Sequence, residues 1–308
     1  MTRKSNVKIA LRQIANSLLL NAGKINEPGF FNGKIGIALF FYHYIQIDNN
    51  RVYSGFADEL LDDAAGSLNE KMSVNFADGM TGIAWTINYL IENKFIEADC
   101  NVLEDIDIVL KNNYPDISAD LNSEYPLFSK GIYFIERNYH FDYWVNVLDE
   151  IKNVLTQSSR IFPLNYLISI MYVFSQINIK FSADLLPDLY EQMIRSIKNK
   201  NYMLPDAWIL KNMVEQFFSK QDFTFGMEWN LLLNMLDYEN VNGIFNWKIY
   251  GLVYNKLKID NRVVVNIFDS ININKQVETM IKDVYRNLNL YNGLAGVGLT
   301  LIDYLNCI

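Results

Sequence analysis

Two aspartates stand where helices are expected to begin, and carboxylates in such positions could carry out acid–base chemistry. Asp78 directly precedes Gly79, and Asp206 directly follows Pro205. Two carboxyl groups in different environments can act as a proton donor and an ionised base, as in glycoside hydrolases. Aspartate at a helix start also caps exposed backbone amides, which is the simpler role. Asp78 and Asp206 are therefore candidate catalytic residues, with capping as the alternative.

Amide and indole side chains recur at the same kind of position and could bind a substrate. Amides exchange hydrogen bonds with peptides and sugars, and indole rings stack against both. Such residues also serve as helix caps, in the case of Asn32, Asn242 and Asn292, or as core, in the case of tryptophan. The candidate substrate-binding residues are Asn32, Asp78, Trp85, Trp208, Asn246, Trp247 and Asn292.

Thiols and imidazoles are too few and too dispersed to predict a metal site. The chain has two cysteines, Cys100 and Cys307, and two histidines, His43 and His140. None has a second ligand at the short spacing that marks zinc sites. We therefore expect no metal and no cofactor. Cysteines this scarce also argue against a disulfide framework and favour a reducing, cytoplasmic location.

The candidate residues recur because the sequence repeats with a period of about forty residues. The clearest copies are residues 31–38, 77–84 and 291–298, each a Gly-x-x-Gly that opens an apolar run. Residues 245–250 form a degenerate copy in which aromatic residues replace both glycines. With three weaker copies, the second glycine position falls at 36, 82, 131, 169, 210, 250 and 296, so seven copies fill the chain.

Each copy is expected to form a pair of helices. The apolar segments after the glycines, such as 35–44 and 83–91, would be inner helices, and amphipathic segments would lie outside them. Proline is tolerated in the first turn of a helix, and four prolines precede the glycine positions in the expected phase. These are Pro28, Pro126, Pro163 and Pro205. Residues 2–20 are expected to form a first amphipathic helix, and the expected outer helices include residues 53–68, 102–111, 142–155 and 184–198.

The fold class predicted from this pattern is all-α, a ring of helical hairpins. A short strand at Val263–Val265 is the minority alternative, because β-branched runs favour strands. Residues 269–274 are expected to form a polar loop. Half of the residues are apolar, which is enough for a large core in a single domain spanning residues 1–308.

The net charge of -8 limits the classes of partner. An acidic surface does not attract phosphate backbones or anionic lipids, so we expect no nucleic-acid binding. No apolar run approaches the roughly 20 residues that span a bilayer, so we expect no membrane insertion. A neutral or basic peptide or partner protein suits this charge, and a sugar or other small molecule is a possible ligand.

The glycine copies, and above all residues 290–305, resemble the lanthionine synthetase C-like family. The resemblance implies an α/α toroid of seven inner and seven outer helices. It also implies a catalytic zinc bound by a cysteine two places before the first glycine of the fifth copy, and by a Cys-His pair directly before that of the sixth. In this chain those positions hold Pro205, Phe245 and Asn246. None of them supplies a thiolate or imidazole ligand.

The family's additional active-site histidine would fall near Asn165 or Lys130, and neither is an imidazole. The first hypothesis is therefore a divergent, zinc-free member of the family that binds a peptide or partner enzyme in the modification of ribosomally made peptides. The second is a carboxylate-dependent hydrolase or lyase acting on carbohydrate, on a related α/α barrel. The third is a non-catalytic scaffold.

Overall fold

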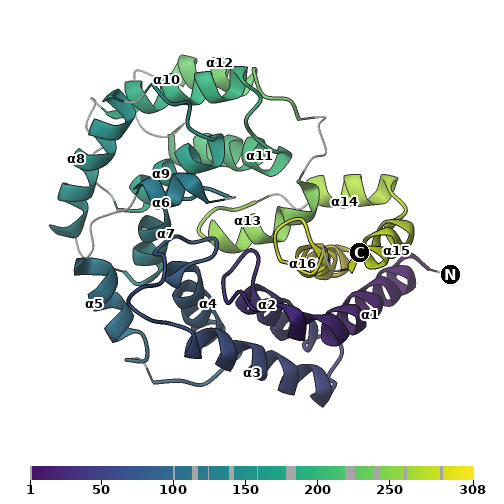
Figure 1. Ribbon diagram of the computed structural model, residues 1–308. Helices are drawn as coiled ribbons and strands as arrows, with labels where there is room; N and C mark the ends of the chain where they lie inside the picture. Colours follow the sequence, from purple (N-terminus) through teal and green to yellow (C-terminus); the bar gives the residue numbers. More distant parts are fainter. Residues whose placement is uncertain are drawn as a thin grey trace.

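A computed structural model describes residues 2–99, 101–112, 117–123, 125–138, 142–157, 159–177, 185–218, 226–238, 243–259, 262–284 and 287–308. Every regular element in these ranges is helical, and they contain no strand. The prediction of an all-α fold is confirmed (Figure 1). None of the helices in these ranges combines the length and the apolar character needed to cross a membrane.

The buried helices within the described ranges follow the predicted repeat. Their apolar character on nearly every face explains why neighbours cover them on all sides. Each contacts the next in chain order, and the last contacts the first, so they form a closed circuit around the middle of the molecule (Figure 1). They are α2 Lys34–Tyr44, α4 Met80–Glu92, α7 Ser129–Glu136, α9 Leu164–Gln176, α11 Leu204–Met213, α13 Trp247–Val253 and α16 Leu294–Cys307.

Most of the remaining described helices lie outside this circuit, whereas α6 overlaps α7 and α9 in this view (Figure 1). Two intervals hold two helices instead of one, α5 with α6 and α14 with α15. The remaining helices are α1 Arg3–Asn21, α3 Arg51–Gly66, α5 Glu104–Asn112, α6 Ile117–Asn122, α8 Asp142–Gln157, α10 Leu185–Lys198, α12 Gly226–Leu233, α14 Arg262–Ser270 and α15 Ile273–Lys282.

The alternative of a strand at Val263–Val265 is wrong, because these residues belong to α14. Val264 and Phe268 are buried whereas Asn266 between them is exposed, which fits a helix and not a strand, where all three would share one face. The loop expected at 269–274 is also shorter than predicted. Asp269 and Ser270 end α14, and Asn272 caps α15 by accepting a hydrogen bond from the Lys275 amide at 3.1 Å.

The helix start is built in the same way in the three copies that have the Gly-x-x-Gly pair. The first glycine, Gly33, Gly79 or Gly293, is the N-cap residue. A Cβ atom on the second glycine would lie 2.0 Å from the carbonyl oxygen six residues earlier, so the chain can fold back onto the helix only where that atom is missing. The pairs are Gly36 with Phe30, Gly82 with Phe76, and Gly296 with Leu290.

The predicted phase is displaced in two of the copies that lack this pair. α9 begins at Leu164 and α11 at Leu204, so Ser169 and Leu210 lie well inside their helices and not in the first turn. Pro163 and Pro205 mark these starts correctly, as the N-cap of α9 and a first-turn residue of α11. The residue of α11 that matches the second glycine by its place in the helix is therefore Asp206.

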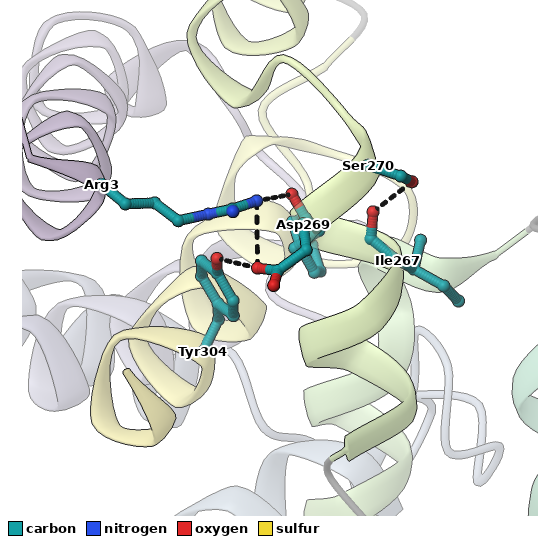
Figure 2. A network of polar contacts seen from close by, with 6 residues as sticks. Arg3, Ile267, Asp269, Ser270 and Tyr304 are labelled. Carbon is teal, nitrogen blue, oxygen red and sulfur yellow. Dashed lines mark hydrogen bonds and ion pairs between the residues drawn. The ribbon is translucent and has the colours of Figure 1, made fainter.

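A network of polar contacts links α1 to α14 and α16 (Figure 2). Arg3 donates to the carbonyl of Phe268 at 2.8 Å and pairs with the Asp269 carboxylate at 3.0 Å. The hydroxyl of Tyr304 donates to the same carboxylate at 2.7 Å. Asp269 thus joins α1, α14 and α16.

Candidate functional site

The starts of neighbouring inner helices are hydrogen-bonded to one another through equivalent positions of the repeat. The amide of Phe31 donates to the carbonyl of Ala77 at 2.8 Å, and the amide of Leu290 donates to the carbonyl of Phe31 at 2.9 Å. These bonds hold the turns before α2, α4 and α16 side by side. Polar side chains on the three turns are therefore brought to one end of the helix circuit.

Four of the predicted binding residues meet at this end in two hydrogen-bonded pairs. Asn32 Nδ2 donates to Asp78 Oδ1 at 3.3 Å, and Asn246 Nδ2 donates to Asn292 Oδ1 at 2.9 Å. Asn289 Nδ2 extends the first pair by donating to Asn32 Oδ1 at 2.9 Å. We call these five residues, Asn32, Asp78, Asn246, Asn289 and Asn292, the amide rim.

The rim is partly open to solvent. Asn292 is exposed, Asn32, Asp78 and Asn289 are half-buried, and Asn246 is buried. Its polar groups can therefore exchange some internal hydrogen bonds for bonds to a ligand. Asn289 was not among the predicted residues, although it precedes Gly293 by four positions, as Asn75 precedes Gly79. Asn75 also bonds within its turn, accepting from the Asp78 amide at 2.8 Å, so this recurrence was the missed signal.

The N-cap residues of α2, α4 and α16 are glycines, and not the candidate caps Asn32, Asp78 and Asn292. Asp206 does cap its helix, because its Oδ2 accepts from the Met203 amide at 2.7 Å. Asn242, the remaining candidate cap, lies outside the described residues.

Next to the rim, four aromatic rings fill the space at the helix starts. Ring centroids lie 5.1 Å apart for Phe31 and Tyr125, 4.9 Å for Tyr125 and Tyr291, and 5.7 Å for Tyr125 and Tyr250. All four residues are buried. We call them the aromatic cluster. The three tyrosines were not predicted as site residues, because they come from three separate segments that only the closed circuit brings together.

Asp206 lies against this cluster and is 2% exposed. Its Oδ1 accepts hydrogen bonds from the hydroxyls of Tyr250 at 2.8 Å and Tyr125 at 3.2 Å, and the two hydroxyls also contact each other. Burial raises the pKa of the Asp206 carboxyl to about 7, and the bond from the Met203 amide opposes the rise. The result is an enclosed carboxyl group that tyrosines cover.

The structure does not pair the two candidate carboxylates as a glycosidase requires. Asp78 bonds to Asn32 on the rim, whereas Asp206 bonds to phenols inside the cluster. A substrate that bonded to Asp206 Oδ1 would compete with the hydroxyls of Tyr125 and Tyr250. Two carboxyl groups flanking an accessible sugar bond are the geometry of that chemistry.

The three predicted tryptophans occupy different surroundings. Trp85 is buried and stacks on Tyr89 with centroids 5.4 Å apart. Trp208 packs on Tyr238, next to the end of α12, with centroids 5.2 Å apart. Trp247 is buried at the start of α13, next to Asn246. Trp85 and Trp208 therefore contact residues other than the rim.

The residues at the predicted zinc positions do not fit a zinc ion. Pro205 is in the first turn of α11, and Phe245 and Asn246 form a short 3-10 segment before α13. If the copies are aligned at the first residue of each inner helix, the expected zinc-ligand positions become Asn201, Ile244 and Phe245. These side chains are no better as zinc ligands. Within the described ranges no three His, Cys, Asp or Glu residues gather as a metal site. Cys100 and His140 lie outside them, so the absence of a metal stays a prediction.

The positions expected for the additional histidine hold an asparagine and a lysine. Asn165 is buried and donates to the carbonyl of Pro126 at 2.6 Å, and Lys130 is 2% exposed. Neither position supplies an imidazole.

Comparison with known proteins identifies one family. Residues 24–160 match the family model described as lanthionine synthetase C-like protein. No curated protein matches the chain. The matched range holds α2, α4 and α7, and therefore Asn32 and Asp78 of the rim.

Proposed function

Residues 24–160 of this chain are lanthionine synthetase C-like, and from that premise we propose that the whole chain is a divergent member that binds a peptide or partner enzyme without zinc. Its role would lie in the modification of ribosomally made peptides, in the cytoplasm. The observation that carries the proposal is the amide rim, which presents donors and acceptors beside an aromatic cluster where zinc ligands were expected. Amide side chains match the alternating donors and acceptors of a peptide backbone.

We propose that the architecture is the α/α toroid of the family, as a single domain over residues 1–308. The closed circuit of buried helices would be its inner layer. The pairs α5 with α6 and α14 with α15 would each fill one outer position, giving seven inner and seven outer units.

The net charge of -8 favours a neutral or basic peptide over an acidic one. The carbohydrate alternative draws no support from the covered position of Asp206. A pure scaffold differs from the proposal only in what occupies the rim, so peptide binding is the property to test.

The zinc-free part of the proposal is tested by metal analysis. Protein purified without chelators and dialysed should retain far less than one zinc per chain, measured by inductively coupled plasma mass spectrometry. Retention of one zinc per chain would show that residues other than those at the expected positions bind it, and would overturn this part.

The binding part is tested with a labelled precursor peptide encoded beside the gene. Asn292→Ala and Asn32→Ala should each weaken binding roughly 3–10-fold in fluorescence anisotropy, the size expected for the loss of one hydrogen bond. Asn153→Ala, on the exposed face of α8, is the matched control and should leave affinity unchanged. If all three variants bound the peptide as tightly as the wild type, the amide rim would not be its binding site.

A further inference from the structure

A polar pocket of about 270 Å³ lies at the ends of the inner helices opposite to the amide rim. Its walls include Trp85, Tyr89 and Glu92 of α4, Glu136 at the end of α7, and Asn255 and Lys256 just after α13. α13 is not a neighbour of α4 or α7 in the circuit. The pocket therefore lies inside the circuit and not between two adjacent helices. We call it the C-terminal pocket.

One wall of the C-terminal pocket carries a buried donor without an acceptor. Trp85 is 1% exposed, and its Nε1 has no hydrogen-bond partner among the described residues. Stacking on Tyr89 and edge contact with Phe30 hold the indole ring in place. A buried N–H that has lost water and gained no partner is unfavourable, so a ligand oxygen at this point would be stabilised.

A second wall carries a buried acceptor that is held in position. Glu136 Oε2 accepts from Asn255 Nδ2 at 3.0 Å, and Asn255 Oδ1 accepts from the hydroxyl of Tyr172 at 3.3 Å. These bonds fix the carboxylate, while its Oε1 is buried and has no partner among the described residues. The spare oxygen is therefore preorganised for a donor.

The charges of the pocket favour a cationic donor. Glu136 and Glu92 contribute two carboxylates, and Lys256 contributes one ammonium, which lies 3.4 Å from the carbonyl of Ile135. A small ligand that neutralises the excess carboxylate and also carries an oxygen acceptor would satisfy both unpartnered atoms.

We propose that the C-terminal pocket binds an α-aminoacyl group, which is a protonated α-amine next to a carbonyl. The ammonium donates to Glu136 Oε1, with Glu92 adding attraction, and the carbonyl oxygen accepts from Trp85 Nε1. This group occurs in free amino acids and at the N-terminus of a peptide. The proposal does not depend on peptide binding at the amide rim, which lies at the other end of the helices.

The test follows the indole N–H resonance of Trp85 in the ¹⁵N-labelled protein, assigned with Trp85→Phe. L-alaninamide carries the proposed group, and N-acetyl-L-alaninamide lacks only the charged amine. The Trp85 resonance should shift on titration with the first and stay unchanged with the second. No shift with L-alaninamide at millimolar concentration, or equal shifts with both, would overturn the proposal.

Calorimetry with two variants tests the carboxylate. Glu136→Gln should weaken L-alaninamide binding at least 10-fold, as expected for a charge-assisted bond. Glu191→Gln, on the exposed surface of α10, should have no effect. Unchanged binding by Glu136→Gln would contradict the assignment. Titration of the full chain with L-alanine and with tri-L-alanine then shows whether the natural ligand is a free amino acid or a peptide N-terminus. In L-alanine the aminoacyl group ends in a carboxylate, whereas in tri-L-alanine it continues into a peptide bond.

Discussion

The buried Asp206 and the half-buried His43 have pKa values displaced in opposite directions. Burial raises that of Asp206 to about 7 and lowers that of His43 to about 4, with Lys248 adding to the second effect. Between these values the folded protein keeps the proton of Asp206 and has lost that of His43. As pH rises from 4 toward 6.5, Asp206 therefore reduces the free energy of unfolding, while His43 increases it.

Because these two effects offset each other, removing one should expose the other. In Asp206→Asn the free energy of unfolding should rise between pH 4.5 and 6.5 more steeply than in the wild type, by about 1.4 kcal/mol per pH unit at most. Urea unfolding at four pH values measures this slope. Asp99→Asn, at an exposed position, should keep the wild-type slope. If Asp206→Asn also kept it, Asp206 would not titrate as described.

At the level of single residues, the candidate site could be predicted only in part from the sequence. Asn32, Asp78, Asn246 and Asn292 could be found because the repeat marks them. Tyr125 could not, because it precedes a copy with an altered turn and meets Asp206 only across the closed circuit. Asp206 was found for its position in the sequence, but nothing in its neighbours predicted that phenols cover it.

Among the elements, the starts of α2, α4 and α16 depend on a missing side chain. Gly82→Ala places a Cβ atom 2.0 Å from the carbonyl oxygen of Phe76, a backbone atom that cannot move without disturbing the turn. We expect a loss of roughly 3 kcal/mol or more in the free energy of unfolding.

The matched control for this substitution is Gly55→Ala in α3, where nothing lies within 4 Å of the added Cβ atom. Alanine is the better helix former, so this variant should gain about 0.5–1 kcal/mol. Thermal and urea unfolding of the two variants would check both values. Equal effects would show that the turn tolerates a side chain.

The glycine turns also explain which elements were predictable. Where the pair is present, the observed helix starts lie close to the predicted ones, at Lys34 against residue 35 and at Met80 against residue 83. Where it is absent, only proline marked the start, and the phase slipped inside α9 and α11. The division into α14 and α15 was missed because Asn272, which caps α15, also suits a loop.

In the whole molecule, α1 closes the structure by packing against α15 and α16. Arg3 and Asp269 are each more than two-fifths exposed, at 42% and 47%, so their ion pair is weak. Asp269→Asn should therefore lower the free energy of unfolding by less than about 1 kcal/mol, with a smaller effect in high salt.

Apolar packing should hold α1 in place far more strongly. Leu11 is fully buried on the inner face of α1, and Leu11→Ala should cost about 2–5 kcal/mol. Urea unfolding at low and high salt distinguishes the two contributions. A larger loss for Asp269→Asn than for Leu11→Ala would reverse this order.

The contact between α2 and α16 has a consequence for synthesis. α2 ends at Tyr44 and α16 begins at Leu294, so roughly 250 residues separate two helices that cover each other. Ribosomes add about 5–20 residues per second, which leaves that side of α2 without its partner for some tens of seconds. During this interval the nascent chain presents Phe40, which later packs against Gly298, to whatever chaperone meets it first.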